Sequence, residues 1–260
     1  AYGRGHARLS ETLWQRAAGL GIPPGVIGLE RAEAMGDRAH RLLEEGRTGG
    51  AVAACRDLLA LREASPGHVG RAGHLLLRAG EAAEAEAAFR RAVAVRPAHA
   101  DLWLGLSQSP ARQERQDEAI EVEKEAHAAL PREAELATHL GHLLIGAGPD
   151  RHAEAEGVFR AVLGWQPGNG RALYGLSVVL AARGEPAEAL SLAQRAVFRL
   201  PGNQEAMAWL ARLVLASGDA VRAERLFRGV AQAQPGLAEA HLGLADALLA
   251  LGREEEALDA

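Results

Sequence analysis

Apolar and polar residues follow one another along most of the chain with the spacing of a helix. Apolar residues recur three and four positions apart, as at Leu102 and Leu106, which places an apolar stripe on one face of an α-helix. Glycines such as Gly184 and Gly218 separate consecutive stripes, at turns where a left-handed backbone is needed. The pattern therefore predicts an all-α fold of short amphipathic helices joined by tight turns.

This pattern repeats every 34 residues. Prolines that stop the second helix of each repeat mark the period at Pro97, Pro131, Pro167, Pro201 and Pro235. A small residue in the first helix, where two helices cross, recurs at Ala39, Gly73, Ser107, Gly141, Ser177, Ala211 and Ala245. An alanine in the second helix recurs at Ala51, Ala85, Ala119, Ala155, Ala189, Ala223 and Ala257. Each series has one step of 36, which locates a two-residue insertion in the turn between Gly141 and Ala155.

The period divides the chain into a non-repeat segment, residues 1–31, and a repeat domain, residues 32–260. Six complete repeats begin near Ala32, Pro66, Ala100, Ala134, Gly170 and Gln204. A seventh begins at Ala238 and stops midway through its second helix, so either the natural protein continues or the last residues are disordered. We expect a short helix from Ser10 to Ala18, which either caps the repeats or belongs to a preceding segment.

One repeat, residues 100–133, departs from the pattern. Pro110 lies inside its expected first helix, and Glu123 replaces the large apolar residue found as Phe89, Phe159 and Phe227. Because proline inside a helix costs about 3 kcal/mol, we expect this helix to be short or kinked. The alternative is a merely degenerate repeat.

The repeats resemble the tetratricopeptide repeat family. Residues 238–257 look like the first half and turn of one such repeat, and the spacing of Ala85, Phe89, Ala92 and Pro97 is similar to the second half. The resemblance covers residues 32–260. It implies a right-handed α-solenoid of antiparallel helix hairpins, whose first helices line a concave groove that binds another protein.

Composition excludes several functional classes. The 29 basic and 34 acidic residues are interspersed and give a net charge of −5, so no basic surface for nucleic acid is expected. No apolar stretch reaches the roughly 18 residues that cross a bilayer, and no signal-peptide core is found in the first ten residues. We expect a soluble protein without direct membrane insertion; its compartment is left open, with the cytoplasm favoured over the periplasm.

No catalytic motif is present. The chain lacks a phosphate-binding glycine loop, a His-Glu-x-x-His metal motif and a Gly-x-Ser-x-Gly nucleophile turn. Cys55 occupies the slot of Phe89, which indicates a small core residue rather than a nucleophile. We therefore predict a protein that is not an enzyme and that has no cofactor and no metal.

Histidines gather on the first helices. One repeated slot holds His40, His74, Gln108 and His142. His139 lies one turn before His142, and Glu135 lies one turn before His139, which is a spacing that could ligate a divalent metal. The alternatives are a polar groove lining that responds to mild acid and ordinary surface histidines.

The later repeats carry apolar residues in slots that the family resemblance assigns to the groove. Aromatic and arginine side chains there are favoured interface anchors, although Trp209 could instead pack between adjacent hairpins. The groove is predicted to change from polar to largely apolar along its length. The complete expected partner-binding set is Tyr174, Val178, Trp209, Arg212, Leu242, His74, Arg112, His139 and His142.

The leading hypothesis is a non-catalytic scaffold that binds a peptide or a partner helix of another protein in its groove. The alternative is the repeat region of a larger multidomain enzyme, for example a transferase, whose catalytic domain lies outside this chain. Self-association through the apolar C-terminal part is a further possibility, which a concentration-independent monomer in light scattering would exclude.

Overall fold

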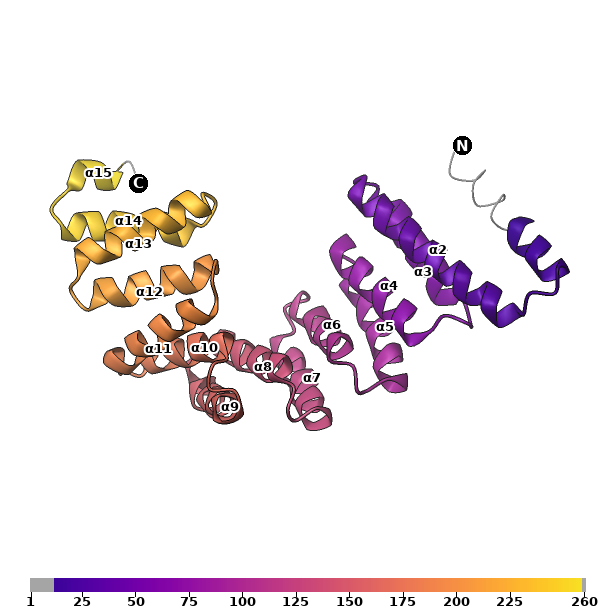
Figure 1. The fold of residues 1–260 in the computed structure, drawn as a ribbon, viewed down its shortest axis with the longest axis horizontal. Helices are drawn as coiled ribbons and strands as arrows, with labels where there is room; N and C mark the ends of the chain where they lie inside the picture. The colour runs from indigo at the N-terminus through magenta and orange to yellow at the C-terminus, as the bar shows by residue number, and fades with distance from the viewer. Residues whose placement is uncertain (1–11, 259–260) are drawn as a thin grey trace. The chain divides into compact units, whose positions relative to one another are not determined.

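The computed structural model describes residues 12–258, and all the regular elements in that range are helical. The helices form antiparallel hairpins that stack in chain order within two compact halves, Ala1–Pro131 and Arg132–Ala260. The hairpins of each half can be followed in Figure 1. The predicted all-α class of stacked helix hairpins is therefore confirmed.

The first half contains a short N-terminal helix, residues 12–19, and three hairpins. The predicted start of that short helix, Ser10, lies outside the described residues. The hairpins are α2 (Pro24–Glu44) with α3 (Thr48–Ala60), α4 (Pro66–Ala79) with α5 (Ala82–Val95), and α6 (Ala100–Ala111) with α7 (Gln116–Ala129). Helix α2 begins at Pro24, eight residues before Ala32, because proline is well suited to the first position of a helix.

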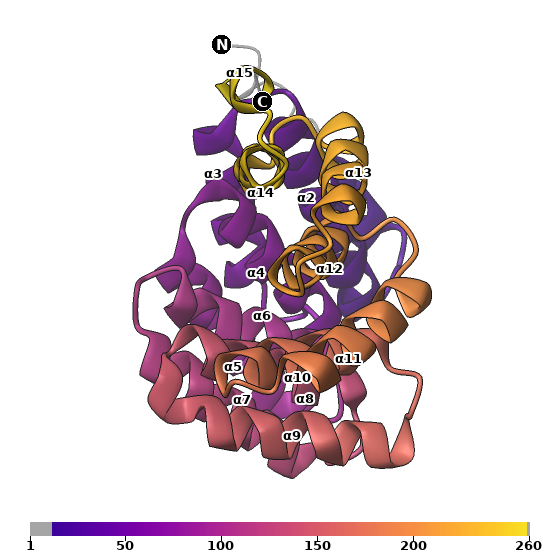
Figure 2. The same ribbon diagram turned by 90° about the vertical axis from the view of Figure 1, so that its left-hand side faces the viewer.

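The second half continues with the same type of hairpin. Its elements are α8 (Ala134–Gly146), the 3-10 turn η1 (Pro149–Arg151), α9 (His152–Trp165), α10 (Gly170–Ala182), α11 (Pro186–Arg199), α12 (Gln204–Ala216), α13 (Ala220–Ala233), α14 (Ala238–Ala250) and α15 (Glu254–Leu258). Helix α13 packs against both α12 and α14, as Figure 2 shows from the side. The predicted insertion is confirmed, because η1 lengthens the turn between α8 and α9.

A large side chain fills most junctions between consecutive hairpins. Phe89 of α5 is fully buried, and a Cβ atom added at Gly105 of α6 would overlap its ring. In the second half, Phe159 of α9 and Gly175 of α10 form the same pair. Glycine is required at these slots because the phenylalanine ring occupies the space that a side chain would take.

One junction has the opposite arrangement. Ala193 of α11 stands in the slot of Phe159, and Trp209 of α12 stands in the slot of Gly175. Trp209 is half-buried, and its Nε1 donates a hydrogen bond of 2.8 Å to Ser177 Oγ of α10. The structure therefore places Trp209 between hairpins, as the alternative interpretation of this residue expected.

The irregular repeat is accommodated with little disturbance. Helix α6 has 12 residues, one fewer than α8, and Pro110 lies in its last turn. The predicted shortening is therefore confirmed but slight, because only Ala111 follows Pro110 in α6, so the missing N–H and the proline ring displace little of the helix. Glu123 is fully buried in the phenylalanine slot, where one carboxylate oxygen accepts a 2.6 Å hydrogen bond from Ser107.

Candidate partner-binding sites

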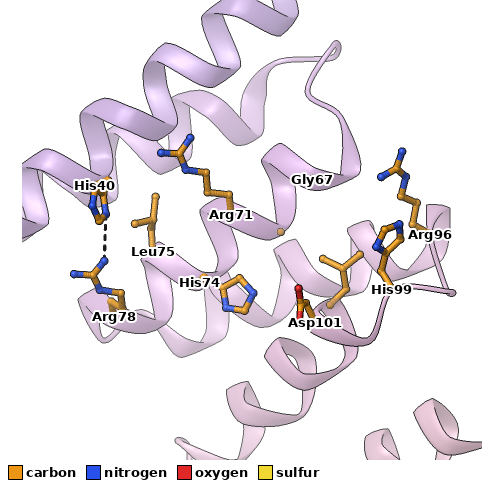
Figure 3. Close-up of a pocket in the computed structure, with 11 residues that line it drawn as sticks. His40, Gly67, Arg71, His74, Leu75, Arg78, Arg96, His99 and Asp101 are labelled. Atoms are coloured by element: carbon orange, nitrogen blue, oxygen red, sulfur yellow. Dashed lines mark hydrogen bonds between the residues drawn. The ribbon is translucent and has the colours of Figure 1, made fainter. Parts of the chain in front are cut away.

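A hollow of about 520 Å³ opens on the first half, between α2, α4, the α5–α6 turn and α6. Small and apolar residues line one part of it, and these are Gly67, Gly70, Leu75 and Leu102. The rest of the lining is polar, with three arginines, three histidines and one carboxylate: His40, Arg71, His74, Arg78, Arg96, His99 and Asp101. Figure 3 shows these side chains around the opening. We call this site the first-half hollow.

Local sequence explains why these residues meet. Gly70 lets α6 approach α4 closely, since a Cβ atom at this position would overlap the side chain of Leu102. Arg96 follows the last residue of α5, and His99 precedes the first residue of α6. The turn between these two helices therefore carries Arg96 and His99 to the edge of the hollow (Figure 3).

Two of the three arginines are already paired with carboxylates of α2. Arg71 donates to Glu33 at 2.8 Å and to Asp37 at 2.7 Å. Arg78 donates to Glu44 at 2.6 Å and lies 3.2 Å from His40 Nδ1. These ion pairs hold the two guanidinium groups against α2.

Arg96 and His99 differ from Arg71 and Arg78 in having no partner of this kind on α2. Both side chains are exposed, and they form no hydrogen bond or ion pair with any of residues 12–258. Asp101 is the one carboxylate of the lining. The unpaired hydrogen-bond donors of the hollow are therefore concentrated at the α5–α6 turn.

His74 links the hollow to the core. Its ring packs edge-on against Phe89, with ring centroids 4.8 Å apart. Burial lowers the pKa of His74, while the nearby Asp101 raises it by a smaller amount. The neutral imidazole is therefore favoured, and His74 contributes a ring and a hydrogen-bonding nitrogen rather than a charge.

A second hollow, of about 280 Å³, lies between α12 and α14 in the second half. It brings together Arg212 and Leu242, as expected from the sequence, and Leu242 is 69% exposed. Two carboxylates also line it, Glu239 and Asp246, and Arg212 donates to Glu239 at 2.9 Å. The second-half hollow therefore combines this ion pair with the apolar side chains of Leu215, Phe227 and Leu242.

Tyr174 and His142 form a separate ring cluster in the second half. Their ring centroids are 5.8 Å apart, and His142 also contacts Phe159 at 5.3 Å. Burial lowers the pKa of His142 to about 4, with smaller contributions from the charges of His139 and Arg171. Burial also raises the pKa of the Tyr174 hydroxyl. The lowered pKa values of His142 and His74 disfavour a response of these two rings to mild acid.

The remaining residues of the expected set have other surroundings. Val178 and His139 are half-buried on α10 and α8. Arg112 is exposed, and it donates to the carbonyl oxygen of Leu77 at 3.3 Å, near the end of α4. The expected set of nine is thus divided among two hollows, a ring cluster, two residues that bond to neighbouring helices (Arg112 and Trp209), and the half-buried Val178 and His139.

Sequence reasoning missed Arg96 and His99, because it considered the slots of the first helices alone. A signal was available. Arg96 directly precedes Pro97, and His99 follows it by two residues. The α5–α6 turn that contains them comes just before Leu102, which packs on Gly70. Only the folded turn, however, shows that both side chains reach the hollow.

Cys55 and the metal hypothesis can be judged from the same structure. Cys55 is buried, and burial raises its pKa to about 11, so the thiol keeps its proton at neutral pH. Over the described part of the chain, no cluster of three or more His, Cys, Asp or Glu residues has a geometry that could hold a metal ion. In the same residues, no helix is long and apolar enough to pass through a bilayer.

Comparison with known proteins identifies the repeat type. Models of the tetratricopeptide repeat match residues 71–134, 147–213 and 214–260, which is more than half of the chain. No curated protein matches the sequence.

Several solved structures share the fold. A tetratricopeptide repeat protein from Parabacteroides merdae aligns with a TM-score of 0.67 at 16% identity, over 88% of this chain and 90% of its own. PilW, a type IV pilus biogenesis factor, aligns with a TM-score of 0.65 at 22% identity, over 75% of this chain and 89% of its own. The APC/C hetero-tetramer Cut9-Hcn1 contains a chain that aligns with a TM-score of 0.66 at 16% identity, over 85% of this chain and 45% of its own. At these identities the likeness concerns the fold.

Proposed function

This chain belongs to the tetratricopeptide repeat family, whose members generally act as protein–protein interaction scaffolds, and we propose that it binds a peptide segment of a partner protein in the first-half hollow. The observation that carries this proposal is the composition of the hollow. An apolar part lies beside convergent polar groups, which is the usual constitution of a site that binds a small segment. The scaffold acts without catalysis, by holding its partner.

The size of the hollow favours an extended segment over a whole helix. A volume of about 520 Å³ accommodates a few side chains, whereas a partner helix needs a groove that receives anchors over two or more turns. Arg96 and His99 line one edge of the hollow, and the exposed Gly67, with no side chain, leaves room for a peptide backbone to pass close to α4. The bound segment would contribute one or two anchoring side chains.

A blocking substitution tests the proposal. The Cβ atom of a residue at Gly67 would meet nothing nearer than Ser65 Oγ at 3.7 Å, so Gly67→Tyr should fold normally and place its ring in the hollow. Gly49→Tyr is the matched control, because Gly49 holds the same second position of α3 and has open space around it.

The measurement is selection from a displayed library of random 12-residue peptides on the intact chain. We expect enriched peptides whose binding is lost on Gly67→Tyr and unchanged on Gly49→Tyr. The proposal fails if enriched peptides bind both variants equally. Peptides that tolerate Gly67→Tyr but are lost on Leu242→Asp would place the partner site at the second-half hollow instead.

A further inference from the structure

We propose that the segment bound in the first-half hollow is acidic, and that it presents a carboxylate to Arg96 and His99 and an aliphatic side chain to the apolar part. This inference rests on the proposed function, since it names the chemistry of the partner at the same site. It follows from three features of the lining: its unpaired donors, its single carboxylate and its apolar residues.

The first feature is the inventory of donors. An arginine guanidinium carries five N–H donors and no acceptor. Arg71 and Arg78 already donate to carboxylates of α2, but Arg96 has no such partner among residues 12–258. A carboxylate is the group that a free guanidinium binds best, through two parallel hydrogen bonds.

The second feature is the position of the charges around that guanidinium. Glu33, Asp37 and Glu44 belong to α2 and are committed to Arg71 and Arg78. Asp101, at the start of α6, is the one carboxylate that shares the lining with Arg96 and His99 (Figure 3). The negative charge of Asp101 partly offsets the positive charge of Arg96. A singly charged carboxylate therefore fits this edge better than a doubly charged phosphate.

The third feature is the apolar part of the lining. Leu75 and Leu102 are almost fully buried in the wall of the hollow, and Gly67 is exposed beside them. An aliphatic side chain of the partner would cover the small apolar surface that still faces the hollow. A basic segment would instead bring its charge toward Arg96, the arginine of the lining that is not paired with a carboxylate of α2, which is unfavourable in a partly enclosed site. The favoured partner therefore combines Asp or Glu with a neighbouring aliphatic residue.

The test uses the peptides enriched by the displayed library and measures their affinity by fluorescence anisotropy. We expect Asp or Glu beside Leu, Ile or Val in the peptides that Gly67→Tyr rejects. Arg96→Gln should weaken their binding about tenfold. Arg62→Gln is the matched control, because Arg62 is exposed in the α3–α4 turn away from the hollow, and it should leave the affinity unchanged.

Asp101→Asn provides a result that structural damage cannot imitate. Removing this charge should tighten the binding of acidic peptides by about two- to fivefold, because the repulsion between two carboxylates is lost. Raising NaCl from about 0.05 M to 0.5 M should weaken the same peptides, since screening shortens the range of the attraction.

The outcomes separate this inference from the proposed function. Enriched peptides that need an open hollow but are neutral or basic would overturn the acidic partner and leave the peptide site standing. Tighter binding of phosphoserine peptides than of their Glu counterparts would replace the carboxylate by a phosphate. Peptides indifferent to Gly67→Tyr would remove both proposals.

Discussion

The fully buried slot of each second helix decides how the next hairpin packs. Phenylalanine occupies this slot in three second helices, and the following first helix has glycine at the facing position, because a Cβ atom there would overlap the ring. The pairs are Phe89 with Gly105, Phe159 with Gly175, and Phe227 with Gly243. Ala193 and Trp209 reverse the order, because the large ring comes from the later helix. In both arrangements one aromatic side chain fills the junction, so the volume is conserved while its source changes.

Substitutions that convert this junction to the phenylalanine–glycine arrangement test this account. Trp209→Gly should destabilise the chain by about 3 kcal/mol, because a cavity forms and a helix gains a glycine. Ala193→Phe should cost about 1–3 kcal/mol through overpacking against Trp209. The double variant rebuilds the phenylalanine–glycine pair, so its loss should be smaller than the sum by about 2 kcal/mol.

Urea unfolding of the single and double variants gives the coupling energy. Leu258→Gly serves as the control partner for Ala193→Phe, because Leu258 is 89% exposed on α15, and these two changes should be additive. Additive losses for Ala193→Phe with Trp209→Gly would show that the two rings do not fill the same space.

At the scale of the element, the hairpin turns require one residue with a left-handed backbone. Glycine supplies it at Gly46, Gly80, Gly184, Gly218 and Gly252. In the irregular repeat, the equivalent position is Glu114, which has a φ of 60° and is the one described non-glycine residue with a positive φ. A side chain in this region costs roughly 1–2 kcal/mol.

Glu114→Gly should therefore stabilise the chain, by about 0.5–1 kcal/mol after the greater flexibility of glycine in the unfolded state is subtracted. Thermal unfolding followed by circular dichroism measures the gain. Gly218→Ala places a side chain in the same conformation, with φ of 93°, and should lower the stability by about 1 kcal/mol or more. A destabilised Glu114→Gly would mean that the Glu114 side chain makes a contribution greater than the backbone strain.

The sequence predicted the helices better than the side-chain environments. Prolines and glycines mark helix ends through local backbone chemistry, so Pro66, Ala100 and Ala134 are both the predicted and the observed first residues of α4, α6 and α8. Pro110 disrupts α6 less than expected, because only one residue of the helix follows it and little of the helix can be displaced. The left-handed Glu114 escaped notice, since nothing in its own chemistry marks the position.

The site was less predictable, for a physical reason. Helical spacing tells which residues of one helix share a face, and the family resemblance assigned Arg212 and Leu242 to the same groove, where both line the second-half hollow. It does not tell whether a neighbouring helix covers that face, which is why Trp209 could not be assigned to a groove or a junction. Arg96 and His99 belong to a turn, where no periodicity applies.

At the scale of the whole molecule, almost all packing joins helices that are close in sequence. Within each half, a second helix that is followed by another hairpin contacts its own first helix and the next one, as α5 does with α4 and α6. Stability in such an array is roughly a sum of repeat and nearest-neighbour contributions. The two compact halves therefore each contain the contacts needed to fold.

Separate expression of residues 1–131 and 132–260 tests this expectation. Each fragment should show a helical circular dichroism spectrum and cooperative thermal unfolding, because each keeps complete hairpins and their junctions. The full chain is the reference for helical content per residue. A fragment that remains unstructured under conditions where the full chain is folded would show that its hairpins depend on contacts outside the fragment.

The junctions between hairpins have a consequence for how such a chain can change during evolution. Phenylalanine in one hairpin and glycine in the next are complementary in size. Ala193 and Trp209 are also complementary, but with the large residue on the later helix. A duplicated or transplanted hairpin would carry one member of each of two pairs, and each would face a residue of the wrong size in the neighbouring hairpin. The unit that keeps a complementary pair together is thus a second helix with the first helix that follows it. The boundaries of this unit lie within hairpins rather than between them.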